Sequence, residues 1–178
     1  MIWQIRRAKM ELAKADPDLG PSVAPPPGAS LRAISAAERK MCRRLPPSYR
    51  AFLRQHDGWP MFFHGASLLG TRDLPKASHA SKTREAFESY ETPIPEIGPP
   101  ARPEGRPDAM IPFGIDPKAS IIFAFNPAVV RPDGEMEVIM WVNELGERCE
   151  SFHDFLTTVL EMLSDELLER GRTLQKSA

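Results

Sequence analysis

The sequence lacks the short motifs that mark the commonest nucleotide-binding and catalytic sites. Neither G-x-x-x-x-G-K-[ST] nor G-x-G-x-x-G occurs, which excludes both kinds of glycine-rich phosphate loop. The 4 His and 2 Cys residues form no H-E-x-x-H or C-x-x-C pattern. Neither Ser67 nor Ser151 stands in the G-x-S-x-G context of a nucleophile elbow. We therefore expect no enzyme, no cofactor and no metal, unless titratable groups meet in a cleft of the folded chain.

Long apolar runs are also missing. No stretch approaches the roughly 20 apolar residues that a membrane-spanning helix needs. The first 18 residues have no long apolar core and no small-residue cleavage site, so we expect no signal peptide. The two cysteines, Cys42 and Cys149, are too few for a secreted disulfide framework. These absences predict a cytoplasmic protein with free thiols and no membrane partner.

Proline, by contrast, is abundant, with 19 in 178 residues, about twice the ordinary usage. Residues 16–30 contain a Pro25–Pro27 run that favours polyproline II, and we expect a stiff linker or, alternatively, a ligand for a proline-recognition module. Residues 92–108 are expected to form a long loop. The expected organisation is an N-terminal arm over residues 1–30, one domain over 31–170 and a tail over 171–178.

Charge is unevenly distributed, although the formal net charge is only -1. Residues 1–103 carry 16 Lys and Arg against 10 Asp and Glu, whereas residues 104–169 carry 4 against 14. The acidic part is either a solvated surface or a face for a basic partner, because complementary charge speeds and selects association. The acidic contact residues on the second interpretation are Asp133, Glu135, Glu137, Glu144 and Glu147. We expect Glu135 and Glu137 on an exposed hairpin, without the burial that tunes a carboxyl for acid–base catalysis.

A basic helix is expected to begin at Ser35, with Glu38 completing an S-x-x-E capping box, and to end near Arg44. Its apolar stripe would consist of Ala37, Met41 and Leu45. Its basic residues are Arg39, Lys40, Arg43 and Arg44. Such a helix could offer a surface to phosphate or nucleic acid, but it has no interleaved aromatic residues and no groove-binding motif. We therefore expect no direct contact with nucleic acid.

The next helix has both ends marked, by Pro46-Pro47 and by Asp57-Gly58. An aromatic face is predicted by the i, i+3, i+4, i+7 spacing of Tyr49, Phe52, Leu53 and His56. Arg50 and Arg54 are expected on the other side, in water. After the turn come Trp59 and Phe62, which are either core residues or the aromatic anchor of a contact surface.

The remaining periodicity predicts a sheet with helices around it. Residues 1–15 are typical of a short amphipathic helix, and residues 76–90 of part of another. The clearest helix begins at Ser151, with Asp154 in its cap. The expected strands are 66–69, 110–113, 121–125, 136–142 and 147–150. After Asn126-Pro127, residues 131–134 are expected to form a turn.

These pieces together resemble the SMI1/KNR4 family, also called the SUKH superfamily. The resemblance covers roughly residues 30–168. It rests on Ser35 and Glu38, Leu45–Leu53 followed by Asp57-Gly58, Leu68-Leu69, Ile111–Gly114, and the Ser151-Phe152-x-x-Phe155-Leu156 pattern of the closing helix.

The resemblance implies an α+β fold, with a mostly antiparallel sheet flanked by helices. Bacterial members of the family look like immunity proteins that neutralise polymorphic toxins, often nucleases or deaminases, and fungal members look like regulatory scaffolds. We therefore expect a non-enzymatic protein-binding domain that occludes a cognate toxin with a basic surface. The alternative is a scaffold that binds an endogenous partner, with residues 20–29 as an attachment.

Overall fold

The computed structural model of the chain describes residues 1–16, 22–88, 106–142 and 145–176. Within them, one sheet has the order β1-β2-β3-β4-β5-β6, and every neighbouring pair is antiparallel. The strands are β1 (Trp59–Phe63), β2 (Ala66–Leu68), β3 (Ile111–Ile115), β4 (Ile121–Val130), β5 (Met136–Val142) and β6 (Leu145–Cys149). Each strand pairs with its neighbour in the sequence, as short connections favour. The predicted α+β class is confirmed.

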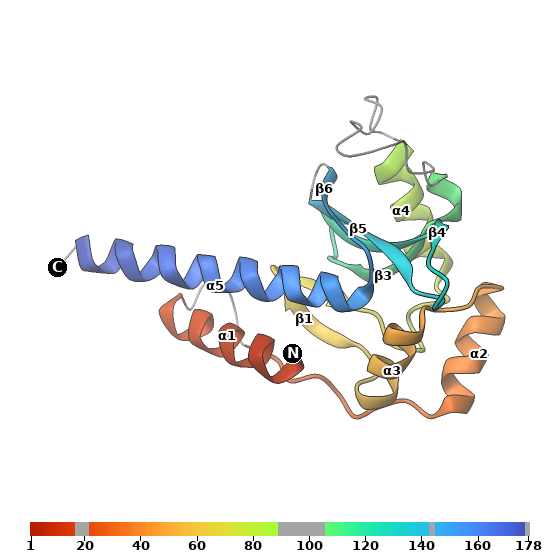
Figure 1. Cartoon of the computed structure of the whole chain (residues 1–178), viewed down its shortest axis with the longest axis horizontal. Helices are drawn as coiled ribbons and strands as arrows, with labels where there is room; N and C mark the ends of the chain where they lie inside the picture. The colour runs from red at the N-terminus through yellow and green to blue at the C-terminus, as the bar shows by residue number, and fades with distance from the viewer. Residues whose placement is uncertain (17–21, 89–105, 143–144, 177–178) are drawn as a thin grey trace.

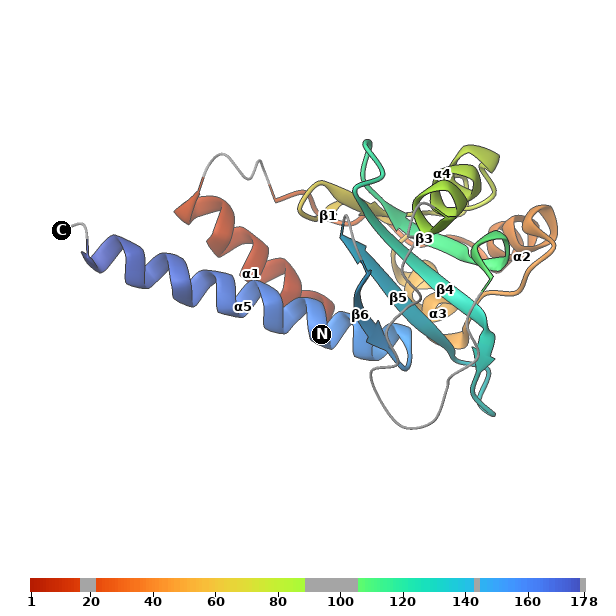
Figure 2. The same ribbon diagram turned by 90° about the horizontal axis from the view of Figure 1, so that it is seen from above.

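Helices cover both faces of the sheet. The described helices are α1 (Ile2–Ala15), α2 (Leu31–Met41), α3 (Pro47–Gln55), α4 (Ala77–Glu88), the short 3₁₀ helix η2 (Pro107–Ala109) and α5 (Phe152–Lys176). Helices α3 and α5 pack against one face, and α4 with η2 against the other (Figure 2). Helix α1 lies along α5 at one end of the molecule, and α2 is at the opposite end (Figure 1).

The main core surrounds Tyr49 of α3. Its ring lies 5.2 Å from that of Phe113, 5.3 Å from Phe125 and 4.9 Å from Phe152, measured between centroids. Its hydroxyl donates a 2.7 Å hydrogen bond to the Leu69 carbonyl, so the polar atom is satisfied inside an apolar cluster. Burial raises the pKa of Tyr49 well above its usual value. The predicted aromatic face of α3 is therefore its core side.

Strand β4 is longer than expected. The predicted end at Phe125 is wrong, because the strand continues to Val130. Its pairing with β5 shifts register between Asn126 and Val130. A bulge of this kind accommodates a proline that cannot donate to the ladder. Helices cover both sides of the strand, so its first six residues are all buried, as the continuous apolar run indicates.

The N-terminal residues pack on the rest of the chain. Helix α1 confirms the predicted helix, and its Ile5 and Leu12 belong to the main core. The described part of the proline-rich segment is also bonded to the core. The Val23 carbonyl accepts a 2.7 Å hydrogen bond from Trp59 Nε1, and the Pro27 carbonyl accepts one of 3.1 Å from the Asp57 amide.

Most of the expected loop at residues 92–108 lies outside the described residues, and only its end at η2 is described. Among the described helices, none combines the length and the apolar character needed to cross a bilayer.

Candidate functional site: a groove between two helices

A hollow of about 1080 Å³ runs between α2 and α3 and reaches the hairpin of β4 and β5. We call it the α2–α3 groove. Helix α2 lines it with Leu31, Ser35, Glu38 and Arg39, which at i, i+4, i+7 and i+8 share one face of the helix. This volume exceeds most small-ligand pockets, and the groove lies open at the surface.

The second wall comes from α3. Pro47, Arg50, Ala51 and Arg54 line it at i, i+3, i+4 and i+7, which is the side opposite the buried aromatic face. Because the core fixes α3 through Tyr49, its polar face is presented to the groove in one orientation.

Helix α2 begins earlier than expected. Its N-cap is Ser30, whose hydroxyl accepts a 3.1 Å hydrogen bond from the Ala33 amide. The predicted start at Ser35 is wrong, because Ser35 lies within the helix. Ser30 is the last residue of the proline-rich segment, and no proline interrupts the chain from there to Leu45, so a helix can begin at this cap. The early start also places Ile34 in the core, a contact that the predicted stripe missed.

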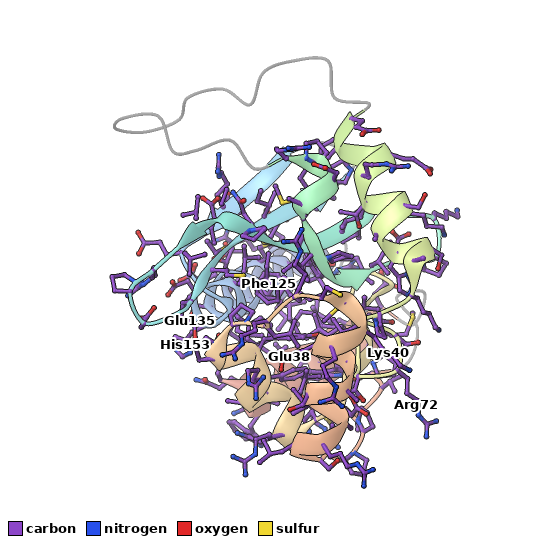
Figure 3. The ribbon with its side chains drawn as sticks, turned by 90° about the vertical axis from the view of Figure 1, so that its right-hand side faces the viewer. Glu38, Lys40, Arg72, Phe125, Glu135 and His153 are labelled. Carbon is purple, nitrogen blue, oxygen red and sulfur yellow. The ribbon has the colours of Figure 1, made fainter. Side chains whose placement is uncertain are left out.

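Glu38 caps no helix, and instead ties α2 to α3. Its carboxylate accepts a 2.9 Å hydrogen bond from the Leu45 amide and forms an ion pair with Arg50. Figure 3 shows Glu38 between the two helices. The expectation that Arg50 lies free in water is therefore wrong. The pair neutralises the floor of the groove and holds the two walls at a fixed separation.

The rest of the groove is positively charged. Four further arginines line it, namely Arg39, Arg43, Arg44 and Arg54. All four are exposed, and within the described part of the chain none has an ion-pair partner. Guanidinium groups bind carboxylates and phosphates through paired N–H donors. The groove is thus a concave surface for an anionic group or segment.

An exposed apolar residue stands near each end. Leu31, 55% exposed, is the first residue of α2. It lies next to the last turn of α3, because the Ala29 amide donates a 2.7 Å hydrogen bond to the Leu53 carbonyl. Val130, 51% exposed, ends β4 near the first turn of α3. Few large apolar side chains are this exposed in the described residues, and two of them line one groove.

Glu135, an expected partner contact, has a structural role. Its carboxylate accepts hydrogen bonds from the Ser48 amide at 2.7 Å and the Ser48 hydroxyl at 2.6 Å. Ser48 is in the first turn of α3, whose N-cap Pro46 supplies no side-chain acceptor. Glu135 therefore caps α3 from the neighbouring hairpin. Asp133, which remains exposed, accepts a 3.0 Å hydrogen bond from the Glu135 amide and orders the turn.

Glu137 lies inside the protein, only 1% exposed. Arg148 binds it in a bidentate pair, with Nε 3.0 Å from Oε1 and Nη2 2.7 Å from Oε2. Asn126 Nδ2 donates a 2.9 Å hydrogen bond to the same carboxylate. The expectation that Glu137 is an exposed hairpin residue is wrong, because both sides of β5 are covered. Glu147 is exposed, whereas Glu144 lies outside the described residues.

Trp59 and Phe62 are fully buried, at 0% exposure each. Their ring centroids lie 5.2 Å apart, and Phe62 also meets Phe155 of α5 at 6.0 Å. Of the two roles that the sequence left open, the structure places both residues in the core.

The groove has no set of groups for acid–base or nucleophilic catalysis. Glu38 is its one carboxylate among the lining residues, and it is already occupied by Arg50 and Leu45. Cys42 ends α2 at the rim with a φ of 51° and no neighbouring base among those residues. In the described part of the chain, no three His, Cys, Asp or Glu side chains gather as metal ligands would.

A family model described as the SMI1 / KNR4 family (SUKH-1) matches residues 28–158. No curated protein sequence matches the chain. The matched residues include both walls of the groove and the whole described sheet.

Proposed function

Since the chain belongs to the SMI1/KNR4 (SUKH-1) family, we propose that it is an immunity protein that neutralises a cognate polymorphic toxin. It would bind a toxin domain of the nuclease or deaminase class and cover its active or substrate-binding site. The protein would act by occupying a surface and would carry out no reaction of its own. We place this role in the cytoplasm, where the exposed thiol of Cys42 stays reduced.

The observation that carries this proposal is the α2–α3 groove. It is large and open, and both of its walls are held by the core. It combines arginines that have no ion-pair partner among the described residues with exposed apolar side chains. Charge complementarity with a desolvated apolar anchor is a common design of specific protein contacts. The lining residues suit recognition of a partner better than catalysis.

Two exposed acidic residues, Asp133 in the turn between β4 and β5 and Glu147 in β6, form a second proposed contact. A toxin with a basic surface stays a prediction that rests on Asp133 and Glu147, since Glu135 and Glu137 are used within the fold. The scaffold alternative relied on the proline-rich arm as an attachment. The described part of that arm is bonded to Trp59 and Asp57, which favours a role in the fold.

The direct test is to co-express the full chain with each toxin domain that a neighbouring gene encodes. We expect the full chain to restore growth and to co-purify with that domain in equal amounts. An empty vector and the chain without its partner serve as controls. Absence of both rescue and complex formation would overturn the proposal.

A further inference from the structure

The groove carries more positive charge than its own residues neutralise. Glu38 balances Arg50, and this leaves the guanidinium groups of Arg39, Arg43, Arg44 and Arg54 exposed. Like charges that converge on one hollow raise its potential and attract an oppositely charged ligand. Arg39 and Arg54 stand on different walls, so a bound anion could meet donors from both helices.

The apolar ends restrict the kind of anion. Leu31 and Val130 each leave about half of their surface in water, at the two ends of the arginine-lined stretch. Covering such side chains removes apolar surface from water and so stabilises a complex, and an inorganic anion has no apolar surface to cover them with. A peptide segment supplies both carboxylates and apolar side chains.

Nucleic acid fits less well. The groove is lined by no Phe, Tyr or Trp, and single strands depend on stacking against such rings. Duplex recognition inserts a protein helix or strand pair into a groove of the nucleic acid, whereas here the protein supplies the hollow.

We propose that the α2–α3 groove binds an acidic segment of a protein partner, with carboxylates against Arg39, Arg43, Arg44 and Arg54 and an apolar side chain against Leu31 or Val130. This inference rests on the proposed function and names the chemistry that the groove recognises. The toxin would insert an acidic, apolar-flanked segment into the immunity protein.

The test uses the full chain and a fluorescent eight-residue peptide with four central glutamates and a leucine at each end. A peptide with glutamine in place of glutamate is the first control. The variant Arg39→Glu/Arg54→Glu changes the groove. Lys40→Glu/Arg72→Glu changes net charge equally at exposed residues that do not line the groove and that carry labels in Figure 3.

We expect anisotropy to show binding of the glutamate peptide that weakens at least about tenfold in Arg39→Glu/Arg54→Glu and less than about threefold in the control variant. Raising the salt concentration from about 50 to about 300 mM should weaken the binding of the glutamate peptide to the unaltered chain. Peptide occupancy should also slow thiol labelling at Cys42, since Cys149 is buried. Circular dichroism checks that both variants fold.

Three results would overturn the inference: equal binding of the glutamine peptide, equal losses in both variants, or tighter groove-dependent binding of a DNA oligonucleotide. If the chain still neutralises its toxin in any of these cases, the proposed function stands. If the peptide binds as expected but the chain does not neutralise the toxin, the inference about the groove stands and the proposed function fails.

Discussion

Gly58 illustrates how one residue joins two parts of the fold. Its φ is +88°, and a Cβ placed there would lie 2.7 Å from the Gly70 amide nitrogen and from the Leu68 carbonyl oxygen. Next to it, the Asp57 carboxylate accepts a 2.6 Å hydrogen bond from the Thr71 amide. The Asp-Gly turn after α3 is therefore packed against the chain that follows β2.

Replacing Gly58 by alanine should reduce the free energy of unfolding by about 2–4 kcal/mol, because left-handed strain adds to a backbone clash. Gly65 provides a matched control. Its φ is +89°, but a Cβ there meets nothing within 4 Å. Gly65→Ala should cost only about 1 kcal/mol in strain. Urea unfolding of both variants measures the difference, and equal losses would contradict the packing described at Gly58.

Lys9 offers a second test at the scale of a single residue, in which the free energy of unfolding is measured against pH. Its ammonium donates to the Met61 carbonyl and lies 5.3 Å from the centroid of the Trp59 ring. Burial lowers the pKa of Lys9 from 10.5 to about 8. Between these pH values the unfolded chain binds more protons than the folded chain, so stability attributable to Lys9 rises with pH.

We therefore expect the stability of the wild type, relative to Lys9→Met, to increase from pH 8 to pH 10.5 and to stay constant below pH 8. Chemical denaturation across this range measures the difference. A relative stability that stays constant from pH 8 to pH 10.5 would show that the pKa of Lys9 is not lowered in the folded chain, and a fall would show that it is raised.

At the scale of elements, periodicity and cap residues predicted most of the fold. The helix at Tyr49 was predicted because it has an apolar stripe and two marked ends. The helix after Ser151 was predicted because it has an amphipathic pattern and a marked start. The start of α2 was not, because Ser30 and Ser35 are both acceptable caps and tertiary contacts decide between them. Local patterns also could not show that Glu38 joins α2 to α3 or that Glu135 caps α3.

The cap on α3 is testable. Glu135→Ala should lower the free energy of unfolding by about 1 kcal/mol, because the first turn of the helix loses its acceptor. Glu147→Ala, at an exposed residue, should change it by less than about 0.5 kcal/mol. The same urea assay compares the two, and a neutral Glu135 variant would argue against the cap. If Glu135 acts only within the fold, the variant keeps its affinity for the toxin.

At the scale of the whole molecule, the sequence predicted an acidic contact surface because acidic residues are concentrated in its second half. Folding disperses them: Glu137 enters the core and Glu135 turns toward α3. The basic residues behave differently, since Arg39 and Arg54 come from separate helices and meet in one groove. The chemistry of each side chain was evident from the sequence, but the groove depends on how α2 and α3 cross.

The most direct test of the account is amide hydrogen exchange of the full chain, alone and bound to its toxin domain. If the α2–α3 groove is the contact surface, the strongest added protection should fall within residues 31–54. Protection centred on the hairpin at residues 131–136, with residues 31–54 unchanged, would contradict the account and favour an acidic contact surface.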